Sequence, residues 1–167
     1  TLYVNGVEAG EWKYGFTAFE HEITPFLKPE GENELLLKVD CRFPSARWYT
    51  GAGIFRDVHL ILKNPCHFRD GGVYVTAGLK DGQPEYEVTA EVETEGQPYE
   101  LRHTILEKGE LEPWSPEHPR LYTLRSELIV NGQVQDTVDT RIGFRQLRFS
   151  PDEGFSINGQ RMKLNGV

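Results

Sequence analysis

The chain has 167 residues, with 18 Lys and Arg against 26 Asp and Glu, a net charge of −8 and a pI near 5.2. This acidic balance argues against a nucleic-acid-binding protein, which needs a basic face toward phosphates, and against an anionic membrane surface as partner. Its 17 Gly, 10 Pro and 11% aromatic residues favour short strands and turns over long helices.

The two cysteines, Cys41 and Cys66, are too few for a disulfide scaffold. We expect two buried free thiols, although a single bridge between them is compatible with the sequence. No stretch approaches the ~20 apolar residues that span a bilayer. The chain starts at Thr1 without a signal segment, so we expect a soluble protein whose compartment the sequence leaves open.

The first predicted elements are a strand over residues 1–4 and a hairpin turn at Asn5-Gly6, because Asn-Gly between apolar runs is a strong hairpin signal. Aromatic residues follow at Trp12, Tyr14, Phe16 and Phe19, spaced by small or polar residues. We predict that they share one strand face. Two interpretations stay open, because such rings are usually core but can also stack on sugars.

A polar turn at residues 30–33 leads into a predicted strand from Glu34 to Val39. Three consecutive leucines, Leu35 to Leu37, predict a central strand that is covered on both faces. The pair Asn33-Glu34 lies in the turn before this strand. We do not predict that Glu34 of this pair is catalytic, because the pair does not follow a strand of the kind found in a catalytic barrel.

The stretch Ser45–Leu60 combines arginines and aromatic residues with a glycine-rich centre, and its end from Ile54 to Leu62 predicts a strand. Small residues at Gly51 and Gly53 permit close backbone approach or positive φ. The structural interpretation is a bend between two strands that is stabilised by ion pairs. The alternative is a segment that also contacts a ligand, and Arg47 is then the candidate residue.

A polar segment, Lys63–Gly72, predicts a linker between two β-rich units. Beyond it the pattern predicts an immunoglobulin-like sandwich, with an Asn131-Gly132 hairpin between the last two strands. Only five strands can be assigned where such a sandwich has seven. The predicted strands are Val73–Ala77, Glu85–Val92, Tyr99–Leu106, Leu121–Val130 and Gln133–Ile142.

Three prolines keep the segment Glu112–Leu124 extended, and Trp114 within it is expected to close one end of the core. The chain ends in Phe155–Val167, which predicts a tight hairpin around Asn158-Gly159. No pattern of metal ligands, phosphate loop or nucleophile elbow is present in the sequence.

Four motifs in this order resemble glycoside hydrolase family 2, which includes β-galactosidases, β-glucuronidases and β-mannosidases. They are the stretch Ser45–Leu60, the Trp-Ser-Pro…Leu-Tyr run from Trp114 to Tyr122, the Ile-Gly-Phe-Arg motif at Ile142–Arg145, and the terminal hairpin with its Lys-Leu-Asn-Gly-Val end. The resemblance implies an all-β chain: a partial jelly-roll (galactose-binding-like) sandwich followed by an immunoglobulin-like β-sandwich. The implied domains are the C-terminal half of the jelly roll (1–62), the immunoglobulin-like domain (63–142), and a linker and hairpin leading into a missing (β/α)8 barrel (143–167).

In the family both catalytic glutamates come from the barrel. The resemblance therefore implies the non-catalytic N-terminal portion of a retaining glycosidase, a β-galactosidase by its terminal motif, with no catalytic residue, metal or cofactor in this chain. Arg47 and Asn165 are the implied substrate-adjacent residues, although many family members carry Arg in place of the Asn. The expected partners are the carbohydrate and the chain's own barrel, and the fragment is expected to self-associate.

A second class of function fits the same residues. A stand-alone carbohydrate-binding sandwich without hydrolase activity would hold glycan by stacking on Trp12, Tyr14 and Phe16. A purely structural adhesion repeat is less compatible with the sequence, because the two β units show no internal repeat.

Overall fold

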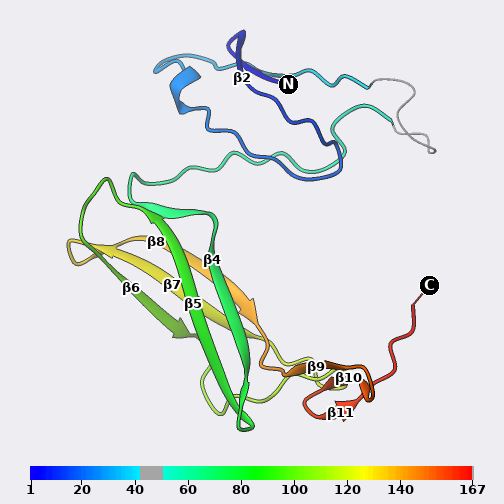
Figure 1. Ribbon diagram of the computed structural model, residues 1–167. Helices are drawn as coiled ribbons and strands as arrows, with labels where there is room; N and C mark the ends of the chain where they lie inside the picture. Colours follow the sequence, from blue (N-terminus) through cyan, green and yellow to red (C-terminus); the bar gives the residue numbers. More distant parts are fainter. Residues whose placement is uncertain (42–50, 167) are drawn as a thin grey trace. The chain divides into compact units, whose positions relative to one another are not determined.

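The computed structural model describes residues 1–41 and 51–166, and the fold is all-β, as the sequence predicts. The chain divides into two compact units, Thr1–Leu60 and Ile61–Val167 (Figure 1). Arg47 lies outside the described residues. In the part that the structure describes, no helix is long and apolar enough to cross a bilayer.

The first unit is built on one small antiparallel sheet with the strand order β2-β1-β3. Its hairpin turn has positive φ at Asn5 (51°) and Gly6 (80°), which two-residue hairpin turns require and which confirms the predicted turn. The elements are β1 (Leu2–Val4), β2 (Val7–Gly10), a 3-10 helix η1 (Thr24–Phe26) and β3 (Leu35–Leu37).

Two sequence predictions for this unit are wrong. Strand β3 lies at the edge of its sheet, and Leu35 and Leu36 are 53% and 59% exposed, so the leucine run is neither central nor covered. The run Ile54–Leu62 forms no strand. Apolar β-branched sequence favours a strand only where a neighbouring strand completes the hydrogen-bond ladder, and the described residues provide none here.

The first unit also buries little apolar surface. Among its described residues, Val4 is the one hydrophobic side chain that is buried. A large set of apolar side chains is exposed instead. They include Ile54, Phe55, Val58, Leu60 and the aromatic residues after β2.

The first strand of the second unit begins earlier than the sequence predicts, because it starts at His67, inside the predicted linker, and not at Val73, and Phe68 is buried. Its five long strands confirm the five that the sequence predicts. They are β4 (His67–Lys80), β5 (Gln83–Glu93), β6 (Tyr99–Ile105), β7 (Tyr122–Val130) and β8 (Gln133–Ile142).

These strands form a two-layer sandwich. One layer is the β4–β5 hairpin and the other is the sheet β6-β7-β8, with antiparallel pairing throughout (Figure 1). On the central strand β7, every second side chain is buried. These inward residues are Tyr122, Leu124, Ser126, Leu128 and Val130.

The apolar core has two clusters along β7. Leu128 and Val130 pack with Cys66 and Phe68 in the first cluster. The second contains Tyr122, Leu124, Ile142 and Phe144. Full burial of one Leu or Val side chain stabilises a fold by about 1.5–3 kcal/mol, so β7 provides much of the stabilisation of this unit. Cys66 is a buried free thiol, whereas Cys41 is only partly buried, so the expectation of two buried thiols is half right.

A further small sheet follows the sandwich, with the order β11-β10-β9. Strands β10 and β11 form the predicted hairpin at Asn158-Gly159, whereas β9 was not predicted. Trp114 links this sheet to the sandwich, because its N–H donates to Phe144 O (2.8 Å) and its carbonyl accepts from Asn158 Nδ2 (3.0 Å). The strands are β9 (Leu147–Ser150), β10 (Gly154–Ile157) and β11 (Gln160–Arg161).

Strand β4 contains a bulge between Phe68 and Val73, where its register with β5 shifts. A Cβ on Gly72 would lie 2.8 Å from Arg69 O and 2.9 Å from Glu91 O. Both contacts are with backbone, which cannot turn aside. The bulge therefore needs glycine at this position.

We expect G72A to destabilise the second unit by about 1–3 kcal/mol, because the backbone must open to admit the methyl group. Urea unfolding followed by circular dichroism measures this change. G78A is the matched control on the same strand, since its Cβ would meet nothing nearer than Arg145 O at 3.9 Å. Equal stability of the two variants would contradict the assignment.

Candidate functional site

The aromatic segment after β2 lies on the surface. Trp12, Tyr14 and Phe16 are 48%, 58% and 59% exposed, and the segment forms no strand, so the predictions of a strand face and of core packing are wrong. Tyr14 and Phe16 meet edge to face with centroids 5.7 Å apart, while Trp12 stacks with Phe19 at 6.2 Å. Exposed rings with fixed neighbours can stack on an apolar sugar face.

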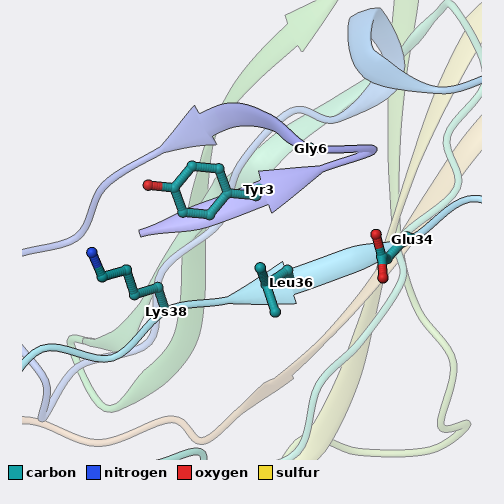
Figure 2. A pocket seen from close by; sticks show the side chains of 5 residues that line it. All are labelled: Tyr3, Gly6, Glu34, Leu36 and Lys38. Carbon is teal, nitrogen blue, oxygen red and sulfur yellow. The ribbon is translucent and has the colours of Figure 1, made fainter.

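A shallow cavity of about 420 Å³ lies on the small sheet of the first unit (Figure 2). Tyr3 of β1 and Leu36 of β3 are register partners on this sheet, and Glu34 and Lys38 flank β3 at its two ends. A ring, an aliphatic side chain, a carboxylate and an ammonium group thus line one surface. Such a set can contact a polar ligand with an apolar face, although the cavity is open and small.

The pair Asn33-Glu34 has a structural role. Asn5 Oδ1 accepts from the Glu34 N–H (3.0 Å), and Asn5 Nδ2 donates to Asn33 Oδ1 (2.8 Å). The Lys28 N–H donates to the same Asn33 oxygen (2.7 Å). The two asparagines therefore join the hairpin turn to the loop before β3.

Asn165 lies exposed in the extended segment after β11, in the second unit. The aromatic residues belong to the first unit, and Arg47 lies outside the described residues. Of the candidate site residues, the structure brings together Tyr14 and Phe16. Among the described residues, no group of three or more His, Cys, Asp or Glu side chains could hold a metal ion.

Sequence reasoning missed a polar pair inside the sandwich. Ser126 is fully buried on β7 between the two apolar clusters, and His103 Nδ1 lies 2.9 Å from its Oγ. The two residues are directly opposed in the β6–β7 register. Burial lowers the pKa of His103, so its neutral form is favoured in the folded protein. Spacing along the sequence could not reveal this pair, because the register of two strands creates it.

The outer face of β6-β7-β8 has a row of ion pairs. Arg102 Nε donates to Glu127 Oε2 (2.8 Å), and Arg125 makes two 2.8 Å bonds to Asp139. These arginines lower the pKa of Glu127 and of Asp139 through hydrogen bonds and charge. Because all four side chains are solvent-accessible, the row sets strand register more than it adds stability.

A carboxylate closes the connection between β6 and β7. Glu107 Oε2 accepts from the Thr123 N–H (2.8 Å), and Oε1 accepts from the Thr123 hydroxyl (3.0 Å). The backbone hydrogen bond from Thr123 lowers the pKa of Glu107. Arg141 on β8 donates to the same hydroxyl (3.1 Å). This network is structural, because it ties three strands together.

The sequence of the sandwich matches a known protein family. Residues 68–145 match the sequence model of the family described as Glycosyl hydrolases family 2, and this range contains β5 to β8 and all of β4 except its first residue, His67. The second unit of the chain therefore belongs to this family. The resemblance seen in its motifs is thereby confirmed.

Relatives in the family support the assignment. The β-galactosidase BoGH2A of Bacteroides ovatus is 28% identical and aligns with 99% of this chain. A β-glycosidase of Bacteroides vulgatus (30% identity, TM-score 0.87) and a β-glucuronidase of Bacteroides uniformis (29%, 0.83) have the same fold over 99% of this chain.

The chain spans about a quarter of the length of these relatives: 23% of BoGH2A, 24% of the β-glycosidase and 25% of the β-glucuronidase. The alignment with BoGH2A runs over 199 positions, more than the 167 residues of this chain. BoGH2A therefore has residues within the aligned region for which this chain has no counterpart.

The burial of His103 is expected to make stability depend on pH. The folded pKa of His103 lies below the unfolded value of about 6.5, so the unfolded chain binds more protons as the pH falls through that value. We expect the free energy of unfolding to fall between about pH 7.5 and pH 5, and to fall less in H103Q. Urea unfolding at several pH values measures it.

His118, which is exposed, provides the control substitution H118Q. Glu107, Glu127 and Asp139 have lowered pKa values, so their stabilising contributions are lost at a lower pH than this window. An unchanged pH dependence in H103Q, or an equal change in H118Q, would contradict the role of His103.

Proposed function

We propose that this chain is a non-catalytic portion of a retaining family 2 glycoside hydrolase that acts on terminal β-D-galactosides. The match of residues 68–145 to the family supports the hydrolase class. The name of BoGH2A and the Lys-Leu-Asn-Gly-Val motif support the galactoside, whereas the β-glucuronidase of Bacteroides uniformis names the competing sugar.

The fold supports a bracing role. Retaining hydrolysis uses two carboxyl groups about 5–5.5 Å apart, and family 2 enzymes hold them in a (β/α)8 barrel. The described residues of this chain instead form antiparallel sheets in two β units. In the proposal these units support the catalytic barrel and form part of the wall around its pocket, with Arg47 and Asn165 as the substrate-adjacent residues.

Hydrolysis assays test this proposal. We expect no turnover of an aryl β-galactoside or an aryl β-glucuronide by the purified 167-residue protein. We expect the full product of the source gene to cleave the galactoside. Robust turnover by the 167-residue protein would refute the bracing role, and a gene product that cleaves only the glucuronide would refute the choice of sugar.

A second candidate function is glycan binding by the first unit, and the exposure of Trp12, Tyr14 and Phe16 is the observation that favours it. If the rings stack on galactosides, titration should quench tryptophan fluorescence saturably, and W12A should abolish this effect. F149A is the matched control, because it removes an exposed ring from the second unit. Saturable quenching that survives in W12A would contradict stacking on Trp12.

A further inference from the structure

The sandwich of the second unit has one open side. In a seven-stranded immunoglobulin-like domain one sheet has four strands and the other has three. Here the three-stranded sheet β6-β7-β8 is complete, but the other sheet contains only β4 and β5. In chain order, the two unfilled positions fall between β6 and β7. The connection there contains no strand among its described residues, 106–121.

The unfilled place lies beside β5. The strands of the larger sheet, lettered in chain order, are arranged A-B-E-D, and β4 and β5 take the places of A and B. The missing strand E would therefore pair with β5. Strand β4 runs alongside β8, which closes the other side of the sandwich. One edge of β5 therefore has no neighbour among the described strands, and alternate backbone N–H and C=O groups point out of that edge.

The edge of β5 suits strand pairing better than the other edges. Its 11 residues are continuous, and its register with β4 is regular from Gln83 to Ala90. Strand β4 is interrupted by its bulge, and β6 has only seven residues. The inward side chains at the open side are half-buried rather than covered. They include Val88, Ala90 and Val92 on β5, and Leu101 and Ile105 on β6.

Charge identifies the kind of strand that fits. The outward positions of β5 include Glu85, Glu87, Glu91 and Glu93. Glu91 and Glu93 lie near Arg69 of β4. Glu85 and Glu87 oppose Gly78 and Thr76 in the β4 register, and neither carboxylate has an ion-pair partner among the described residues.

A second copy of this chain is a poor occupant. Pairing β5 with β5 would place glutamates beside glutamates, and like charges on adjacent strands are destabilising. A strand with lysine or arginine at its outward positions would instead face Glu85 and Glu87. Small apolar residues at its inward positions would cover Val88 and Ala90.

We propose that the free edge of β5 binds an extended polypeptide segment in which basic residues alternate with small apolar ones, by strand addition to the β4–β5 sheet. Backbone hydrogen bonds along the edge supply the affinity, and the glutamates of β5 select the sequence. This site is independent of any sugar bound by the first unit and of the proposed hydrolase role.

The test uses the 167-residue protein and a short, labelled, capped peptide in which Lys alternates with Val. Fluorescence anisotropy should show saturable binding of this peptide and none of a matched peptide with Glu in place of Lys. A third peptide, with N-methyl groups on alternate residues, keeps the charge but cannot donate along the edge. Its failure to bind would show that backbone pairing, and not charge alone, holds the segment.

Substitutions on β5 give the second arm. E85K/E87K should weaken binding of the Lys–Val peptide at least about tenfold and should allow the Glu–Val peptide to bind. E110K/E117K changes the net charge equally at two exposed positions outside the strands and should leave the affinity unchanged. Circular dichroism verifies that each variant is folded.

Three results would overturn the proposal: no binding of the Lys–Val peptide, equal binding of its N-methylated form, or equal binding to E85K/E87K. The peptide comparisons need no substituted protein, so the proposal can fail even if a variant does not fold. In the absence of peptide, a stable dimer of the unsubstituted 167-residue protein paired through β5 would also count against a basic segment as the occupant, because a second copy would then fill the edge.

Discussion

The inward row of β7 is the constraint on which the second unit depends. Strand β7 pairs with β6 on one side and with β8 on the other, and its alternate side chains reach both apolar clusters. Ser126 interrupts this row with a hydroxyl that must be hydrogen-bonded, and His103 satisfies it across the strand pair. A shift of one residue in the register of β7 would move every inward side chain to the opposite face. Both clusters would then lose their β7 residues.

The sequence predicted those parts of the fold that local chemistry determines. Asn-Gly pairs placed three hairpins correctly, because the turn itself demands positive φ at both residues. The sequence-based predictions failed where the formation of a strand depends on a neighbouring strand. Leu35 to Leu37 form an edge strand, Ile54 to Leu62 form none, and His67 belongs to β4 rather than to a linker, since strand formation requires a partner that only tertiary structure supplies.

The candidate site was less predictable than the fold. Residue types singled out Trp12, Tyr14 and Phe16, but their exposure was not evident, because aromatic residues are core in most β units. The His103–Ser126 pair and the network around Glu107 arise from cross-strand register, which spacing along the chain does not encode. Membership of family 2 was predictable because four motifs occur in the family's order, and it agrees with the match over the sandwich.

Hydrogen exchange of the backbone amides, measured residue by residue on the free protein, tests the central claim that β7 organises a sandwich left open beside β5. The account predicts the slowest exchange along β7, at Leu124 and Leu128, where both neighbouring strands and the core protect the backbone. It predicts fast exchange at alternate residues of β5, whose N–H groups point out of the free edge. Uniform protection along β5, as strong as that of β7, would mean that the edge is already paired and would contradict the account.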